Sequence, residues 1–177
     1  MKIYNYLIIL LFITNKSLSQ NNQLKKTGDY LRIILPVSAL STSFILNDKN
    51  GKKQFAKSFI ATQLITFGLK TVIHKPRPDL SNNNSFPSGH TSTVFQSAAF
   101  IQKRYGWEYG IPAYVLAGVT GYSRINAKKH DYWDVFAGAV IGISSSYLFT
   151  TNRDYKKINL TYNANKNGGT LNFRYTF

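Results

Sequence analysis

The chain has 177 residues, enough for one domain with a buried core, and it contains no cysteine. Disulfides, zinc-thiolate sites and thiol nucleophiles are therefore excluded. Charged residues make up only 16%, against roughly 25% in an average soluble domain, yet the formal net charge is +15. So positive a chain favours an anionic partner: nucleic acid, an anionic lipid surface or a phosphorylated substrate.

The N-terminus has the pattern of a secretory signal. Lys2 precedes the uncharged run 3–15, and the small residues Ser17 and Ser19 follow it. A basic start, an apolar stretch of about 7–15 residues and a small-x-small end are typical of a signal peptide. We predict a signal peptide over residues 1–19 and export to the bacterial cell envelope, on the periplasmic side. An uncleaved membrane anchor is the alternative.

Four uncharged runs and one stretch with apolar residues at helical spacing, 55–70, predict five helices, and a polar stretch at 20–29 predicts a linker before them. The runs are separated by turn-forming, often basic breaks; they cover residues 33–47, 55–70, 91–102, 109–123 and 135–152. None clearly reaches the length of about 20 apolar residues that a bilayer span requires, which favours buried core helices. The sequence is compatible with a bundle inside a membrane, on its surface or away from it, and residues 135–152 are the best candidate for a membrane-spanning helix.

The C-terminal tail changes from helical spacing to alternation. Apolar residues alternate with polar ones over 158–162 and 171–177, and Gly168-Gly169 lies between the two stretches. This pattern predicts a β-hairpin, which we expect to lie on the helical domain. The predicted fold class is all-α: a helical bundle over residues 20–152, followed by a small C-terminal β-hairpin within residues 153–177.

Three short blocks carry residues suited to binding a phosphate. They are Lys70 to Arg77-Pro78, then Pro87-Ser88-Gly89-His90, then Ser123-Arg124 followed by His130 and Asp134. A helix that begins at Ser88 and Gly89 presents free N–H groups and a hydroxyl to an anion. Lys70, Arg77 and Arg124 can add positive charge, and arginine suits bidentate contact with phosphate. Each feature alone is more often an ordinary cap or a solvated surface charge.

The histidines supply the groups that could carry out hydrolysis. His130 and Asp134 are four residues apart, so on a helix they would share one face. A carboxylate that accepts from one ring nitrogen leaves the other nitrogen free to attack phosphorus. His90, at the predicted helix start, could protonate the leaving oxygen; His74 has no expected catalytic role. The set predicts a phosphohydrolase that needs no metal and no cofactor.

The three blocks together resemble the signature of the type 2 phosphatidic acid phosphatase (PAP2) family. Lys-x6-Arg-Pro, Pro-Ser-Gly-His and Ser-Arg-x5-His-x3-Asp match it at every position, and the resemblance covers roughly residues 28–150. It implies a PAP2-type bundle in which His130 forms a phosphohistidine, Asp134 orients it, and His90 is the general acid. It also implies a set of phosphate-binding residues: Lys70, Arg77, Ser88, Gly89 and Arg124. Ser123 matches the signature without an assigned role.

The resemblance implies a phosphorylated lipid or lipid pyrophosphate as substrate, such as phosphatidic acid, undecaprenyl diphosphate or lipid A phosphate, at an anionic membrane surface. Lys75, Lys128 and Lys129 lie beside the motifs and suggest an electropositive mouth for such head groups. A broad-specificity periplasmic acid phosphatase acting on small phosphoesters and a non-catalytic envelope protein are the alternatives. The related vanadium haloperoxidases are usually much longer chains. Nucleic acid is not an expected partner, because no recognition motif is present.

Overall fold

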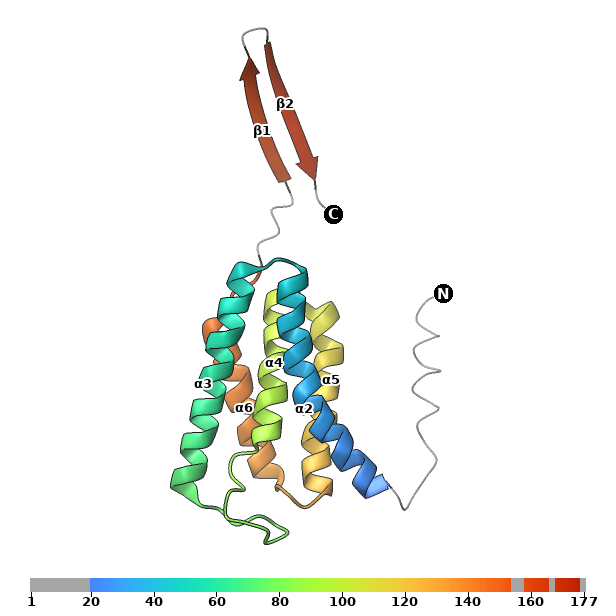
Figure 1. Cartoon of the computed structure of the whole chain (residues 1–177), viewed down its shortest axis with the longest axis vertical. Helices are drawn as coiled ribbons and strands as arrows, with labels where there is room; N and C mark the ends of the chain where they lie inside the picture. The colour runs from blue at the N-terminus through green and yellow to red at the C-terminus, as the bar shows by residue number, and fades with distance from the viewer. Residues whose placement is uncertain (1–19, 154–157, 166–167, 176–177) are drawn as a thin grey trace.

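The structure, a computed structural model, describes residues 20–153, 158–165 and 168–175 and contains a five-helix bundle followed by a β-hairpin (Figure 1). The all-α fold with a small C-terminal hairpin is therefore confirmed, whereas the predicted signal peptide lies outside the described residues. The helices are α2 (Gln20–Ile45), α3 (Lys49–Ile73), α4 (Gly89–Tyr105), α5 (Trp107–Asn126) and α6 (Tyr132–Phe149). The strands are β1 (Ile158–Asn165) and β2 (Gly168–Tyr175).

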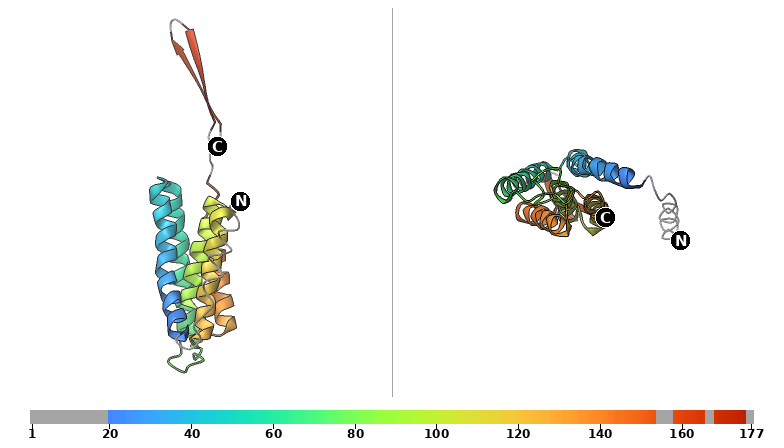
Figure 2. Two further views of the ribbon diagram at one scale, coloured as in Figure 1. Left: turned by 90° about the vertical axis from the view of Figure 1, so that its right-hand side faces the viewer. Right: turned by 90° about the horizontal axis from the view of Figure 1, so that it is seen from below.

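Helix α4 is the centre of the bundle. It contacts each of the other four helices, and most of its side chains are buried. Successive helices run in opposite directions, as Figure 1 and the left view of Figure 2 show. The start of α2, the end of α3, the start of α4, the end of α5 and the start of α6 therefore meet at the lower end in Figure 1. The connection 74–88 lies at this same end.

The stretch 20–29 is not a linker but the first turns of α2, so this prediction is wrong. Gly28 is buried against α5, where an added Cβ would come within 2.0 Å of Ser123 Oγ. Only a glycine permits this approach, and the contact orders a stretch whose own sequence is polar. Tertiary packing thus overrides a weak local preference.

Helices α4 and α6 pack closely because α6 presents glycines to the backbone of α4. An added Cβ on Gly138 would lie 2.6 Å from Ser88 O, and one on Gly142 would lie 2.3 Å from Ser92 O. Larger residues at either position would force the helices apart. Small residues at such interfaces let backbones come into direct contact.

The interior between α3, α4 and α6 is rich in hydroxyl groups. Thr66 Oγ1 donates to Ser92 Oγ at 3.0 Å, and Gln96 Nε2 donates to Ser58 Oγ at 2.8 Å. Ser146 on α6 donates to the carbonyl of Gln96 at 2.6 Å. These polar groups are buried and satisfy one another, so they link the three helices through hydrogen bonds.

The end of the bundle opposite the connection 74–88 contains a buried ion pair. Arg104 Nε and Nη2 donate to the two carboxylate oxygens of Asp48, at 2.7 and 2.6 Å. Asp48 is also the N-cap of α3 and accepts from Gly51 N at 2.9 Å. Phe55 and Phe100 pack edge to face nearby in the apolar core, with centroids 5.1 Å apart. The ion pair of Asp48 and Arg104 therefore links the α2–α3 turn to the last turn of α4.

The outer faces of the helices carry large apolar side chains. They are spread over all four outer helices and include Ile33, Ile34 and Val37 of α2, Leu64 and Phe67 of α3, Ile111 and Val115 of α5, and Trp133 and Phe136 of α6. Among the described helices, none is both long enough and apolar enough to meet the criterion for a bilayer span.

The hairpin pairs β1 and β2 antiparallel, with Tyr162 opposite Leu171. Within the described residues no helix contacts either strand, so the expectation that the hairpin lies on the bundle is wrong (Figure 1). Tyr162, Leu171 and Phe173 are exposed, so no described element covers these side chains.

Candidate active site

The lower end of the bundle brings together side chains from every helix and from the connection 74–88. Lys70 lies in the last turn of α3, and the position that a Cβ on Gly89 would take is 3.8 Å from Lys70 Cε. Lys70 Nζ donates to Asn84 O at 2.7 Å. Burial, and then the charge of Arg77, lower the pKa of Lys70 to about 8. Lys70 is therefore still mostly cationic at neutral pH and stands beside the start of α4.

Arg77 lies in the connection 74–88, close enough to Lys70 and His130 to lower the pKa of both. Its Nε is buried and has no hydrogen-bond partner among the described residues. Buried donors in folded proteins are nearly always satisfied. This N–H is therefore available to a bound anion.

Ser88 is the N-cap of α4, as its sequence pattern predicts. Its Oγ accepts from Thr91 Oγ1 at 2.9 Å and is fully buried. The Ser88 hydroxyl hydrogen remains as a donor. Gly89 and His90 form the first turn of α4, where a helix has no carbonyl partners for their N–H groups. The helix start can therefore bind an anion through backbone and hydroxyl donors.

Arg124, in the last turn of α5, is buried and held by three protein contacts. Its Nη1 donates to Asp29 Oδ1 at 2.8 Å, its Nη2 to Lys25 O at 2.7 Å, and its Nε to Ser123 Oγ at 3.1 Å. A guanidinium has five N–H donors, so two remain for a ligand. Ser123, which had no assigned role, is thus a support for the guanidinium of Arg124.

His90 is paired with Asp29, a residue outside every recognised motif. His90 Nε2 lies 2.9 Å from Asp29 Oδ1. Burial, followed by the charges of Arg124 and Arg32, lowers the pKa of His90 to about 4, although Asp29 acts in the opposite direction. His90 is therefore neutral at pH 7 in the ligand-free protein. A phosphate dianion bound among these cations would raise its pKa again, because negative charge favours the imidazolium.

His130 and Asp134 do not share a helix face, so this part of the prediction is wrong. Asp131 is the N-cap of α6, which places His130 in the turn before the helix. His130 Nδ1 and Asp134 Oδ2 are nonetheless 3.6 Å apart, both buried. This separation is longer than a hydrogen bond, and Nδ1 has no other partner among the described residues. The helix cap, rather than the helical period, brings the two residues together.

Three further residues hold the carboxylate of Asp134. Lys75 Nζ donates to Oδ1 at 2.8 Å, Asp131 N donates to Oδ2 at 3.1 Å, and Ser85 Oγ donates to Oδ2. Asp131 and Asp134 form a reciprocal capping box, a pattern that the D-x-x-D spacing could have revealed. Nothing in the sequence pointed to Ser85.

Burial, followed by the positive charges of Lys70 and Arg77, lowers the pKa of His130 to about 4. Its side chain is therefore neutral at pH 7, with a lone pair on one ring nitrogen. A neutral imidazole can act as a nucleophile, whereas an imidazolium cannot. The cations that would bind phosphate thus also keep His130 in its reactive form.

The three lysines near the candidate site do not form the unpaired electropositive surface that the sequence suggested. Lys75 pairs with Asp131 and Asp134, and Lys129 pairs with Asp79. Two of the three positive charges are therefore balanced inside the protein. Lys128 is exposed.

We expect Lys75→Gln to lower kcat by about 10- to 100-fold with a smaller change in KM, because a loosened Asp134 misplaces His130. Steady-state phosphate release would measure this split. Lys53→Gln, on the exposed face of α3, is the matched control and should match the wild type. A rise in KM with unchanged kcat would instead return Lys75 to a substrate-binding role.

The described residues include no group of three His, Cys, Asp or Glu side chains able to hold a metal ion. The positive charge at the candidate site comes from Lys70, Arg77 and Arg124, with the N-terminus of α4. Such fixed donors can stabilise negative charge that develops on phosphoryl oxygens.

Comparisons with known proteins show the family to which the chain belongs. The sequence model of the PAP2 superfamily matches residues 52–158. A lipid A 4'-phosphatase of Helicobacter pylori is 33% identical over 139 residues, covering 72% of this chain and 70% of that protein. A lipid A 1-phosphatase of Helicobacter pylori is 29% identical over 134 residues, covering 71% and 70%.

Among solved structures, LpxE of Aquifex aeolicus is similar with a TM-score of 0.66 and 24% sequence identity. The similarity covers 75% of this chain and 86% of that one. It shows that the two chains share a fold.

Proposed function

The chain belongs to the PAP2 superfamily and is a phosphatase, and we propose that it removes phosphate groups from membrane lipids through a phosphohistidine on His130. The observation that carries the mechanism is the buried, neutral imidazole of His130. It lies 3.6 Å from Asp134 and within the electrostatic influence of Lys70 and Arg77. The lipid A phosphatases among its relatives support a phosphorylated glycolipid as the substrate class.

In the first step, the lone pair of His130 Nε2 attacks phosphorus while Nδ1–H faces Asp134. The bond from phosphorus to the leaving oxygen breaks, and His90 gives that oxygen a proton. Lys70, Arg77 and Arg124, with the Gly89 N–H and the Ser88 hydroxyl, hold the three other phosphoryl oxygens. These contacts are stronger in the transition state, where negative charge increases on those oxygens.

In the second step, water attacks the phosphohistidine. His90, neutral after the first step, takes a proton from the water as its oxygen bonds to phosphorus. The phosphorus–nitrogen bond breaks, inorganic phosphate leaves, and both histidines return to their starting states. The same imidazole therefore acts first as acid and then as base, and no co-reactant other than water is needed.

The distribution of polar and apolar residues supports a lipid substrate and membrane association. Large apolar side chains such as Phe67 and Phe136 are exposed, whereas Ser58, Ser92 and Gln96 are fully buried. A soluble protein exposes few contiguous apolar patches of this kind, and such surfaces mark sites of lipid or protein contact. We place the protein at a bacterial membrane, with its catalytic end on the exported side.

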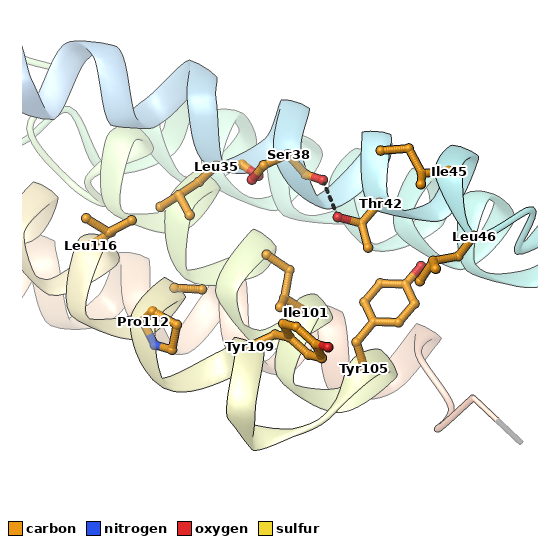
Figure 3. A pocket seen from close by; sticks show the side chains of 11 residues that line it. Leu35, Ser38, Thr42, Ile45, Leu46, Ile101, Tyr105, Tyr109, Pro112 and Leu116 are labelled. Carbon is orange, nitrogen blue, oxygen red and sulfur yellow. Dashed lines mark hydrogen bonds between the residues drawn. The ribbon is translucent and has the colours of Figure 1, made fainter. Parts of the chain in front are cut away.

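An apolar groove between α2 and α5 offers space for a lipid tail (Figure 3). It has a volume of about 500 Å³, and its lining includes Leu35, Ile101, Tyr109, Pro112 and Leu116. The groove lies along the bundle, away from the catalytic end. An acyl chain attached to a head group at that end could lie along α2 and enter it.

The decisive experiment measures phosphate release from lipid A and phosphatidic acid in detergent micelles, and from para-nitrophenyl phosphate. Each reaction is run in EDTA with the wild type and with His130→Ala. Lipid activity that persists in EDTA and disappears in the variant is the expected result. Activity on the soluble ester alone would indicate a broad-specificity acid phosphatase. No activity on any substrate, with a folded protein, would favour a non-catalytic envelope role.

A further inference from the structure

Asp29 connects two residues of the candidate site, His90 and Arg124, although it lies on α2 and is far from every motif along the sequence. We infer that Asp29 is a positioning residue that keeps a hydrogen on His90 Nε2 and thereby makes Nδ1 the nitrogen that exchanges protons during catalysis. The inference rests on the proposed phosphatase function. It adds a second aspartate–histidine pair beside that of Asp134 and His130.

The geometry defines which atom carries the hydrogen. A single oxygen, Asp29 Oδ1, lies 2.9 Å from His90 Nε2 and 2.8 Å from Arg124 Nη1. A carboxylate beside an arginine is ionised and can only accept hydrogen bonds. Burial alone would raise the pKa of Asp29, but Arg124 and His90 hold it below its ordinary value. His90 Nε2 must therefore be the donor.

This tautomer suits both steps of the reaction. When His90 is doubly protonated, Nε2–H stays on Asp29 while Nδ1–H passes to the leaving oxygen as its bond to phosphorus breaks. The neutral ring then has a lone pair on Nδ1, where it can take a proton from the attacking water. Without Asp29, the neutral ring could carry its hydrogen on Nδ1 instead, and that nitrogen could not act as the base.

The space beside this pair fits a leaving group. A hollow of about 500 Å³ opens between α2 and α3, and its lining includes Asp29, Arg32, Gln63, His90 and Thr93. The alcohol released in the first step must lie on the His90 side of the phosphate. The polar side chains in the lining of this hollow, such as Arg32 and Gln63, suit a sugar or glycerol head group.

The charges around His90 set the direction of the pH effect. They come from every helix packed against it: Asp29 and Arg32 on α2, Lys70 on α3 beside Gly89, Arg124 on α5, and Asp134 on α6, whose carbonyl accepts from Ser88 N. Among the described residues, Asp29 is the one carboxylate that pairs with the His90 ring. Removing its charge lowers the pKa of His90, so the acid form is lost at lower pH.

Asp29→Asn is expected to lower kcat on phosphatidic acid by at least about tenfold. The alkaline limb of its pH–rate profile should move to lower pH by roughly one unit. The loss should be larger for phenyl phosphate than for para-nitrophenyl phosphate, because the more acidic nitrophenol leaves with less help from an acid. Arg124 acts on the phosphoryl group, so its disturbance would affect both esters equally.

A double-mutant cycle tests whether Asp29 acts through His90. The variant carrying both Asp29→Asn and His90→Ala should be no slower than His90→Ala alone. Glu108→Gln, at the exposed start of α5, is the matched control and should retain wild-type kinetics. Thermal melting of each variant in the same detergent checks that it is folded, and Asp29→Glu provides a charge-conserving variant that should recover part of the activity.

Nitrogen NMR of the labelled histidines gives a readout that does not depend on turnover. We expect neutral His90 to carry its hydrogen on Nε2 in the wild type and to populate both tautomers in Asp29→Asn. An unchanged tautomer, equal losses on the two aryl esters, or additive losses in the double variant would each overturn the inference. A wild type that shows the tautomer but hydrolyses no phosphate would instead contradict the proposed function.

Discussion

Phosphate release should fall by about 10⁴-fold or more in His130→Ala, because removal of a nucleophile leaves only binding and electrostatic stabilisation. Among the described side chains near His130, none is expected to replace the imidazole: His90 is paired with Asp29, and the nearby Lys70 and Arg77 are cations, which are poor nucleophiles. Radiolabelled substrate offers a direct measurement. The wild type, quenched in base, should retain label that acid then releases, as a phosphohistidine does.

His74→Asn is the matched control for this loss. His74 is an exposed histidine at the end of α3 with a left-handed backbone conformation, φ 47°, which asparagine tolerates well. It should retain wild-type activity and labelling. Residual labelling of His130→Ala at the wild-type level would contradict the assignment of the nucleophile.

Arg104→Leu should reduce the free energy of unfolding by about 3–5 kcal/mol, the cost typical of removing one partner of a buried ion pair. Asp48 and Arg104 have side chains only 5% and 7% exposed, so water cannot replace the lost partner. Denaturant or thermal unfolding in detergent would measure the loss. The variant Arg104→Leu with Asp48→Asn should recover part of it, since asparagine also caps a helix.

Lys103→Leu provides the comparison on the same turn of α4. Lys103 is only partly buried and lies 5.0 Å from the ring centroid of Tyr147, a contact worth about 1 kcal/mol or less. A loss in Arg104→Leu no larger than in Lys103→Leu would mean that the buried pair adds little to stability.

The centres of the helices could be predicted from sequence, because each combines an apolar run with local stop signals. Residues 91–102 lie inside α4, whose start at Ser88 and end at Gly106 follow known capping preferences. The first turns of α2 could not be predicted. They are ordered by the contact of Gly28 with Ser123 on another helix, and no local pattern reports such a contact.

The candidate site likewise contains residues that the sequence identifies and residues that only the structure identifies. The motif residues are recognisable because their chemistry is tied to a fixed spacing, as in Pro-Ser-Gly-His. Asp29 is not, since it meets His90 across 61 residues and only through the pairing of two helices. The sequence shows that Lys75 is charged, but it does not show which carboxylate pairs with it. Its contacts with Asp131 and Asp134 required the fold.

The glycines of α6 limit how this enzyme could evolve. A Cβ added at Gly138 would meet the carbonyl of Ser88, the N-cap of α4 in the proposed phosphate site, so any side chain there would move this turn. Changes at this interface would therefore alter the reaction centre and the packing of the bundle at once. New substrate preferences are more accessible through Arg32 or Gln63, which line the hollow beside His90 without supporting another helix backbone. Divergence among such enzymes should accordingly concentrate on the α2–α3 side, while the α4–α6 contact stays constant.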